Sequence, residues 1–268
     1  MARVVVIALL LLAACGAEEP NNSAAPAPAA EAEAPAGPHR VAVCATASLR
    51  RAFEAIAARY ERDHPGASVA LHFDGGTQLL NALNAGERCD VIALGENSVM
   101  ARVVSAGHTA VGSPAELARN RVAIVVAAGN PKRVAGLADF GRDDLRLALG
   151  ARTSSIGRHS RWVLSRLKLA PKPAREAITA DGVLASVAAG EADVGIVYET
   201  TFVGGAPPSV ESIAVPDAQN TAALYTISVA REPLQPRGAA AFRALALAPG
   251  GQQLLHDAGF LPIGAKLP

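Results

Sequence analysis

The sequence predicts an α/β protein with two lobes, each a mostly parallel sheet flanked by helices. Short apolar segments alternate with amphipathic helices from Val41 to Ala106, and a second alternating series runs from Leu145 to Tyr198. Such alternation is typical of parallel sheets with helices on their faces. Because ligands bind such sheets outside the carboxyl ends of the strands, we expect the functional residues at strand-to-helix turns.

Composition narrows the classes of function. Half of the residues are apolar, and 25 Lys and Arg balance 24 Asp and Glu to give a net charge of +1. There is no basic patch with interleaved aromatic residues, so nucleic acid is not expected as a partner. Aromatic residues make up 4% of the chain, which disfavours a sugar site built on stacked rings.

The N-terminus has the pattern of an export signal. Arg3 is followed by the apolar run Val4–Ala14, which is too short to span a bilayer as a helix. The run ends in Leu12-Ala13-Ala14-Cys15, which resembles a bacterial lipoprotein signal with lipidation at Cys15; an ordinary signal peptide is the alternative. We therefore expect a signal peptide at 1–15, an Ala/Pro-rich tether at 16–38 and a folded part from 39. An acyl anchor would hold this part at a membrane, on the periplasmic or cell-surface side.

Two further cysteines, Cys44 and Cys89, fall on or beside expected strands. An exported protein meets an oxidising compartment, but a disulfide also requires Cα atoms closer than about 7 Å. We expect two buried free thiols and leave the disulfide as the alternative. Since no His or Cys shares a ligand-like spacing with them, no metal bound by protein ligands is expected.

The first series begins with the strand Val41–Thr46. Apolar residues then recur with helical spacing, and Ser48 occupies the expected N-cap position. The remaining elements of this series are strands at Val69–Phe73 and Asp90–Leu94 and helices at Gln78–Ala85 and Glu96–Ala106. Arg50 and Arg51, at the start of the first helix, are interpreted as solvated residues, with steering of anions as the alternative.

The second series follows the apolar strand Arg121–Ala127. Its expected strands are Leu145–Leu149, Ala177–Thr179, Val194–Tyr198, Ser212–Val215 and Ala222–Val229. Its expected helices are Arg158–Leu167, Gly182–Ala189, Gly238–Leu247 and Gln252–Ala258. Trp162 is expected in the core.

Four strand-to-helix turns stand out as anion sites. They lie near Ser48, near Thr77, at Ile156–Gly157 and at Gly182–Val183. Each would present free backbone N–H groups and the positive end of a helix dipole. If the four turns converge, they would hold a dianion without a charged side chain.

Six segments, in this order, resemble the periplasmic molybdate-binding proteins of ABC importers. They are Ala45–Leu49, Gly86–Gly95, Asn120–Arg121 with the apolar strand after it, Leu147–Gly150 with Gly157–Arg158, Gly190–Tyr198 and Pro249–Phe260. The resemblance covers nearly all of the expected mature chain. It implies a type II binding-protein fold with lobe 1 at 39–119 plus 223–268, lobe 2 at 120–222, and a ligand cleft between them.

The resemblance also implies a set of binding residues. Two hydroxyls of the first lobe, and two backbone amides and a tyrosine hydroxyl of the second, hold molybdate or tungstate in the family. Carried over, these positions are Ser48, Gly76 or Thr77, Ile156, Val183 and Tyr198. Gly76 departs from the pattern, since the family usually has serine there, and Thr77 or the Gly76 amide would substitute.

The implied function is capture of the oxyanion by a monomer that delivers it to an ABC permease in the inner membrane, with no cofactor and no catalysis. Gly76 and the neighbouring Asp74 keep open a different small oxyanion or a carboxylate as ligand. An anion sensor of the same fold is a further alternative. An exported enzyme is not favoured, since the sequence has no Gly-x-Ser-x-Gly or His-Glu-x-x-His motif. The histidines His72, His108, His159 and His256 are interpreted as surface or structural residues.

Overall fold

The computed structural model describes residues 40–265, which lie within one compact unit, Gly37–Pro268. The expected signal peptide, the lipidation site Cys15 and the tether 16–38 fall outside the described residues. Within 40–265, no helix is both long enough and apolar enough to cross a membrane.

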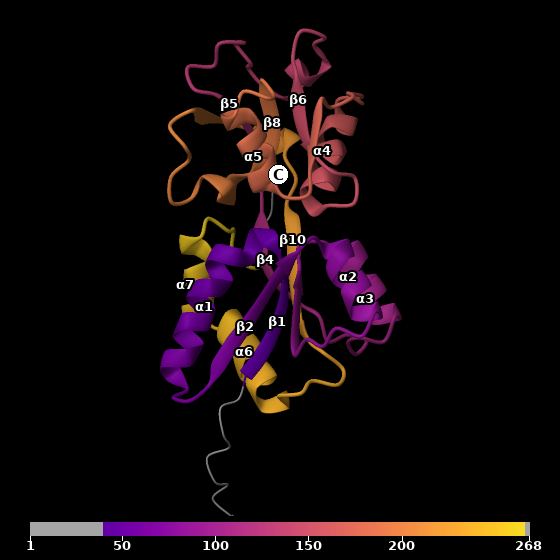
Figure 1. The fold of residues 1–268 in the computed structure, drawn as a ribbon, viewed down its shortest axis with the longest axis vertical. Coiled ribbons are helices and arrows are strands. Elements are labelled where there is room, and N and C mark those ends of the chain that lie inside the picture. The colour runs from indigo at the N-terminus through magenta and orange to yellow at the C-terminus, as the bar shows by residue number, and fades with distance from the viewer. Residues whose placement is uncertain (1–39, 266–268) are drawn as a thin grey trace, which may run out of the picture. The chain divides into compact units, whose positions relative to one another are not determined.

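The first sheet has five strands in the order β2-β1-β3-β10-β4 (Figure 1). They are β2 Ser68–Asp74, β1 Arg40–Thr46, β3 Val91–Leu94, β10 Ala223–Val229 and β4 Ala115–Asn120. Strand β1 is parallel to β2 and β3, whereas β10 is antiparallel to both of its neighbours. Thus a strand from late in the chain lies between two early ones.

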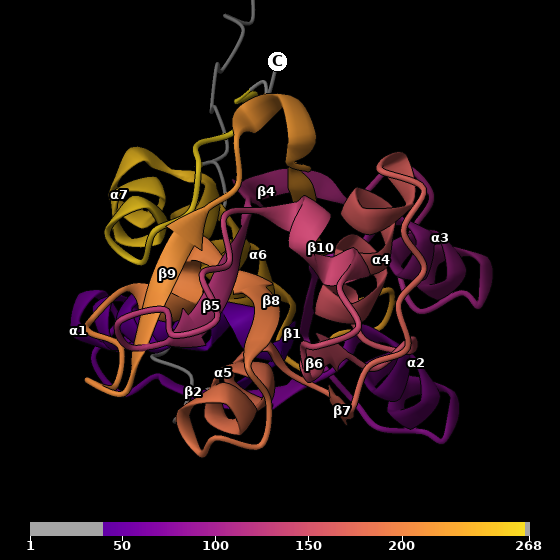
Figure 2. The same cartoon turned by 90° about the horizontal axis from the view of Figure 1, so that it is seen from above.

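The second sheet repeats this arrangement, in the order β7-β6-β8-β5-β9 (Figure 2). Its strands are β7 Arg175–Ala177, β6 Leu147–Gly150, β8 Val194–Tyr198, β5 Val122–Ala127 and β9 Val210–Ala214. Strand β6 is parallel to β7 and β8, and β5 is antiparallel to β8 and β9. Two mixed sheets flanked by helices confirm the predicted fold class.

Helices cover both faces of the first sheet. In Figure 1, α1 (Arg50–Asp63) and α7 (Pro249–Asp257) lie on one side, and α2 (Gly76–Asn84) and α3 (Asn97–Ser105) on the other. Helix α6 (Pro236–Leu247) packs against α1 and α7. The alternation of β1 explains this division, since successive side chains of a strand point to opposite faces. Val43 and Ala45 pack into the core that contains α1, whereas Cys44 packs into the core of α2 and α3.

Two helices flank the second sheet, α4 (Ser155–Arg166) and α5 (Ala180–Ala188). They meet opposite faces of β8. Gly195 lies against α5, because a Cβ added there would collide with Val183. Tyr198, three residues along the strand, contacts His159 of α4.

The chain passes between the two sheets twice, from β4 to β5 and from β9 to β10. Asn220, on the second passage, joins it to the first. Its Oδ1 accepts a hydrogen bond from the Val122 backbone N–H (3.0 Å) and its Nδ2 donates to the Val122 carbonyl (2.9 Å). The side chain is buried, with 3% exposed, so water does not compete for these bonds.

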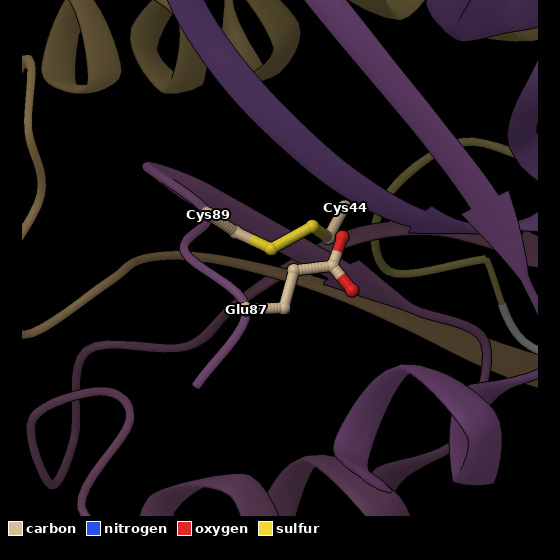
Figure 3. A group of neighbouring side chains, drawn as sticks. All are labelled: Cys44, Glu87 and Cys89. Atoms are coloured by element: carbon tan, nitrogen blue, oxygen red, sulfur yellow. A yellow bond between two sulfur atoms is a disulfide. The ribbon is translucent and has the colours of Figure 1, made fainter. Parts of the chain in front are cut away.

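Cys44 and Cys89 form a disulfide (Figure 3), and the expectation of two free thiols is therefore wrong. The reason is strand register: β1 pairs directly with β3, which begins two residues after Cys89, and the two Cα atoms lie 5.8 Å apart. Glu87 lies close enough to complete a three-residue metal-ligand group. Because both sulfur atoms are committed to the disulfide, this group is not a metal site in the oxidised protein.

One further expectation is wrong, and one strand was missed. Trp162 is 48% exposed rather than buried, and the Arg166 guanidinium lies 5.0 Å from its ring centroid. Strand β4 was not anticipated, because Glu116, Arg119 and Asn120 interrupt its apolar pattern. Its place in the sheet comes from pairing with β10, more than 100 residues away in sequence.

Candidate functional site

A cavity of about 300 Å³ is lined by residues that follow strands of both sheets. The first sheet contributes residues 46–48, 50–51 and 74–75, and the second contributes 155–156, 178–181, Tyr198 and a segment just after it. Strand ends and helix starts of both sheets therefore meet here, at the place where ligands of such sheets bind.

Ser48 lies at this cavity, but it is not a helix cap. A 3-10 turn, Ala47–Leu49, precedes α1, whose N-cap position is Leu49. Freed from capping, the Ser48 hydroxyl is 2.8 Å from the Tyr225 hydroxyl of β10, with which it shares a hydrogen bond. The prediction that Ser48 is the N-cap is wrong, and its hydroxyl can donate to a ligand.

The turn into α2 brings other residues to the cavity than the sequence analysis expected. Asp74 and Gly75 line the cavity, whereas Gly76 and Thr77 do not. Helix α2 begins at Gly76 with no side-chain cap, so its first amides have no acceptor within the helix. The Asp74 carboxylate accepts a hydrogen bond from the Gly75 amide at 2.7 Å.

Helix α4 starts three residues earlier than expected. Its N-cap is Ser154, whose Oγ accepts a hydrogen bond from the Gly157 amide at 3.2 Å. Gly157 also has to be glycine, because an added Cβ would collide with the carbonyl of Ala151. Ser155 and Ile156 line the cavity, and as the first helical residues their amides lack intrahelical acceptors.

Helix α5 also starts earlier than expected, which changes the amide that faces the cavity. Its N-cap is Thr179, whose hydroxyl accepts from the Gly182 amide at 3.1 Å. The Val183 amide donates to the Thr179 carbonyl at 3.2 Å, and the residue is fully buried away from the cavity. Ala180 and Asp181 line the cavity instead and carry the free amides of this helix start.

Tyr198 ends β8, lines the cavity and is 1% exposed. Its ring packs edge-to-face against Tyr225, with centroids 6.4 Å apart. Burial raises the pKa of Tyr198 well above its usual value and raises the pKa of Tyr225 to about 12. Both phenols therefore keep their protons at neutral pH and remain able to donate.

His159, on α4, was not expected to reach the site. Its Nδ1 is 2.8 Å from the Tyr198 hydroxyl. Burial lowers the pKa of His159, which favours the neutral ring. The sequence did contain a signal for His159. It lies four residues after the first residue of α4, a helix that begins at the cavity, and so it falls on the same side of the helix as that residue.

Charged side chains occur at the cavity, but most have partners. Arg50 and Arg51 are exposed and line the cavity. The Arg50 guanidinium lies 4.4 Å from the Phe73 ring centroid, and Arg51 donates to the Val203 carbonyl. Asp74 and Asp181 add two carboxylates, so no excess of cationic side chains surrounds the hydroxyls and helix starts.

An ion pair joins the two sheets beside the site. The Arg158 guanidinium of α4 donates to the carboxylate of Glu96, the N-cap residue of α3. The side chain of Glu96 is 5% exposed and that of Arg158 is 36% exposed. The carboxylate is therefore almost fully buried, while its partner is partly hydrated.

Comparison with known proteins identifies the family. The model of the bacterial extracellular solute-binding proteins matches residues 41–261. The chain belongs to this family. The molybdate-binding protein ModA of Mycobacterium tuberculosis is 32% identical over 253 residues, which are 93% of this chain and 92% of that protein. The resemblance inferred from the sequence motifs is confirmed.

Solved structures agree on the fold. The substrate-binding domain of a putative molybdenum ABC transporter from Clostridium difficile has a TM-score of 0.65, 21% identity, and alignment over 84% of this chain and 99% of its own. The sulfate-binding protein SubI from Mycobacterium tuberculosis has a TM-score of 0.68, 21% identity, and 84% and 88% coverage. Proteins named for molybdenum and for sulfate share the fold, so the fold alone does not select the ligand.

Proposed function

We propose that this protein captures molybdate or tungstate outside the cytoplasm for an ABC importer. The observation that carries the proposal is the set of neutral donors at one cavity: the hydroxyls of Ser48 and Tyr198 and the starts of α4 and α5. The relative with 32% identity, which is named for molybdate binding, supports the choice of ligand.

In the proposed complex, the anion accepts a hydrogen bond from one hydroxyl of each sheet. Ser48 donates from the first and Tyr198 from the second. The amides of Ile156 and Ala180 donate from the starts of their helices, and Ala180 takes the role first expected of Val183. A hydrogen bond to a charged group contributes about 1.5–3 kcal/mol, so a few such bonds hold a dianion without a buried cation.

Two lobes are proposed to close around the anion. The first lobe contains the first sheet and spans 39–119 and 223–268, and the second lobe contains the second sheet and spans 120–222. The passages between the sheets would act as the hinge. The Asn220 bonds to Val122 support this role, because they hold the two passages together. The Arg158–Glu96 pair, which is already formed in this structure, would link the two proposed lobes.

The proposed setting follows from the family and the N-terminal sequence. Members are named as bacterial extracellular proteins. We infer export to the periplasmic or cell-surface side, anchoring through lipidated Cys15, a monomeric state and delivery to an inner-membrane permease. Binding without turnover is the expected activity, since the family is one of solute-binding proteins.

A different oxyanion or a small carboxylate is the second candidate. Asp74 and Asp181 favour it, because their carboxylates line the cavity and would repel a dianion that approached them closely. Either one would accept a hydrogen bond from a ligand that carries a proton, such as a hydrogen phosphate.

A thermal-shift panel tests the proposal. Molybdate, tungstate, sulfate, phosphate and small carboxylates are compared at equal ionic strength. A ligand at about 100 times its Kd stabilises the folded state by about 2.7 kcal/mol, a shift of roughly 5–10 °C at this size. Shifts with molybdate and tungstate support the proposal, whereas a shift only with phosphate or a carboxylate supports the second candidate.

A further inference from the structure

Thr46 occupies a key position in the first sheet. It is the last residue of β1, it lines the cavity and it lies two residues before Ser48. In the parallel register of β1 and β2 it pairs with Asp74, at the turn into α2. Thr46 therefore connects the Ser48 turn with the start of α2.

The hydroxyl of Thr46 has no partner. Its Oγ1 is shielded from solvent and makes no hydrogen bond with any described residue. Thr46 is the N-cap residue of the 3-10 turn Ala47–Leu49, where a threonine hydroxyl usually accepts from a backbone amide, yet it makes no capping bond. A buried hydroxyl without a partner is unfavourable and rare in folded proteins, so it requires an explanation.

The neighbouring helix start offers no hydroxyl to the cavity. Gly75 is the N-cap of α2 and Gly76 its first residue, so neither offers a side-chain donor, and Thr77 does not line the cavity. The Thr46 Cγ2 atom lies 3.7 Å from the position of a Cβ built on Gly76. The threonine side chain therefore stands beside the place where a side chain at residue 76 would be.

We propose that Thr46 Oγ1 is a second oxyanion-binding hydroxyl of the first sheet: the side chain, whose hydroxyl is shielded from solvent in this structure, rotates about its Cα–Cβ bond on binding and donates to the anion together with Ser48. This inference rests on the proposed function, since it names a further donor of the same site. The hydroxyl stays unpaired in the unliganded protein because its partner is the anion. Its position beside Gly76 compensates for the missing side chain there.

Thr46→Val is the informative variant, because it replaces the hydroxyl with a methyl group of similar shape. Loss of a hydrogen bond to a charged ligand is expected to weaken binding of molybdate or tungstate about tenfold to a hundredfold. The unliganded protein should melt at the same temperature or higher, since no protein hydrogen bond is lost. Thr46→Ser keeps the hydroxyl and should bind within a few-fold of wild type.

Thr226→Val is a matched control. Thr226 on β10 also has a buried Oγ1 without a partner, but it does not line the cavity. Its replacement should leave anion affinity unchanged. The control separates the removal of a buried unpaired hydroxyl in general from the removal of one at the cavity.

A rescue variant tests the position of the hydroxyl. A Cβ on Gly76 would meet Val99 at 3.6 Å and Thr46 at 3.7 Å, which are ordinary contacts. Gly76→Ser in the Thr46→Val background should therefore recover part of the lost affinity.

Isothermal titration with molybdate and tungstate tests the inference. The proteins compared are wild type, T46V, T46S, T226V and T46V/G76S. T46V that binds as tightly as wild type, or that loses affinity only together with a lowered melting temperature, would overturn the inference and leave the proposed function standing. Absence of binding by folded wild-type protein would overturn both.

Discussion

His159 Nδ1 and the Tyr198 hydroxyl oxygen lie 2.8 Å apart and share a hydrogen bond between α4 and β8. This bond helps to fix the position of the phenol, which lines the cavity. It also places a titratable ring against a proposed anion donor, in an environment that favours the neutral imidazole.

The first prediction concerns pH. Burial lowers the pKa of His159, whereas nearby Glu96 acts to raise it and Arg158 to lower it. The usual histidine pKa is 6.5, and below this pH the unfolded chain takes up a proton that the folded protein resists. The contribution of His159 to stability is therefore full above pH 6.5 and falls as the pH decreases below it. His159→Gln is neutral and should show a flatter decline in melting temperature between about pH 7 and pH 5.

Thermal unfolding followed by circular dichroism across this range checks the prediction. His256→Gln is the control, because that ring is 70% exposed. Identical slopes for wild type and H159Q would show that His159 titrates normally.

The second prediction concerns Ser48. Its hydroxyl is held at the cavity by Tyr225 and makes no helix cap, so Ser48→Ala should remove a ligand donor with little effect on α1. Affinity for molybdate is expected to fall about tenfold to a hundredfold. The control is Ser105→Ala, whose hydroxyl donates to the Ala101 carbonyl on an exposed part of α3. Equal affinities of S48A and S105A for molybdate would show that the Ser48 hydroxyl does not bind the anion.

The third prediction concerns the disulfide. Cys44 and Cys89 are 45 residues apart in sequence, and a bridge across such a loop typically stabilises the fold by about 2–4 kcal/mol. Addition of a reductant should lower the urea midpoint of the wild type. The midpoint of the C44A/C89A variant should be low already and insensitive to the reductant. A wild-type midpoint that does not respond to full reduction contradicts this expectation.

The fourth prediction concerns the ion pair between the sheets. Arg158→Gln leaves the nearly buried carboxylate of Glu96 without a cation, which should cost about 2 kcal/mol, less than for a pair with both partners buried. Glu96→Gln leaves only a partly hydrated guanidinium and should cost less. Chemical unfolding compares the two variants with Arg59→Gln, which breaks an exposed pair with Asp63 and should change little. A larger loss of stability in E96Q than in R158Q would contradict the conclusion that the carboxylate is the more buried partner.

The sequence predicted those helices and strands that are defined by a local pattern of apolar residues. Strand β8 has the expected bounds, Val194–Tyr198, because five buried residues form an uninterrupted apolar run after Gly190. The two alternating series were also sufficient to predict two sheets with flanking helices. Ser48 and Ile156 were expected at strand-to-helix turns and Tyr198 at the end of a strand, and all three line the cavity.

The remaining site residues depended on details that local patterns leave open. Thr153, Ser154 and Ser155 all suit an N-cap, and only the Ser154 bond to Gly157 shows where α4 begins. At α5, the cap at Thr179 moved the free amides to Ala180 and Asp181 and away from Val183. The disulfide and β4 depended on pairing between strands distant in sequence, which local periodicity does not encode.

Isothermal titration of the purified protein with molybdate tests the central claim most directly, with tungstate and sulfate titrated in parallel. Our account predicts saturable binding of one molybdate or tungstate per chain and a much weaker response to sulfate. Folded protein that gives no binding heat with molybdate or tungstate, while another anion saturates it, would contradict the proposed ligand.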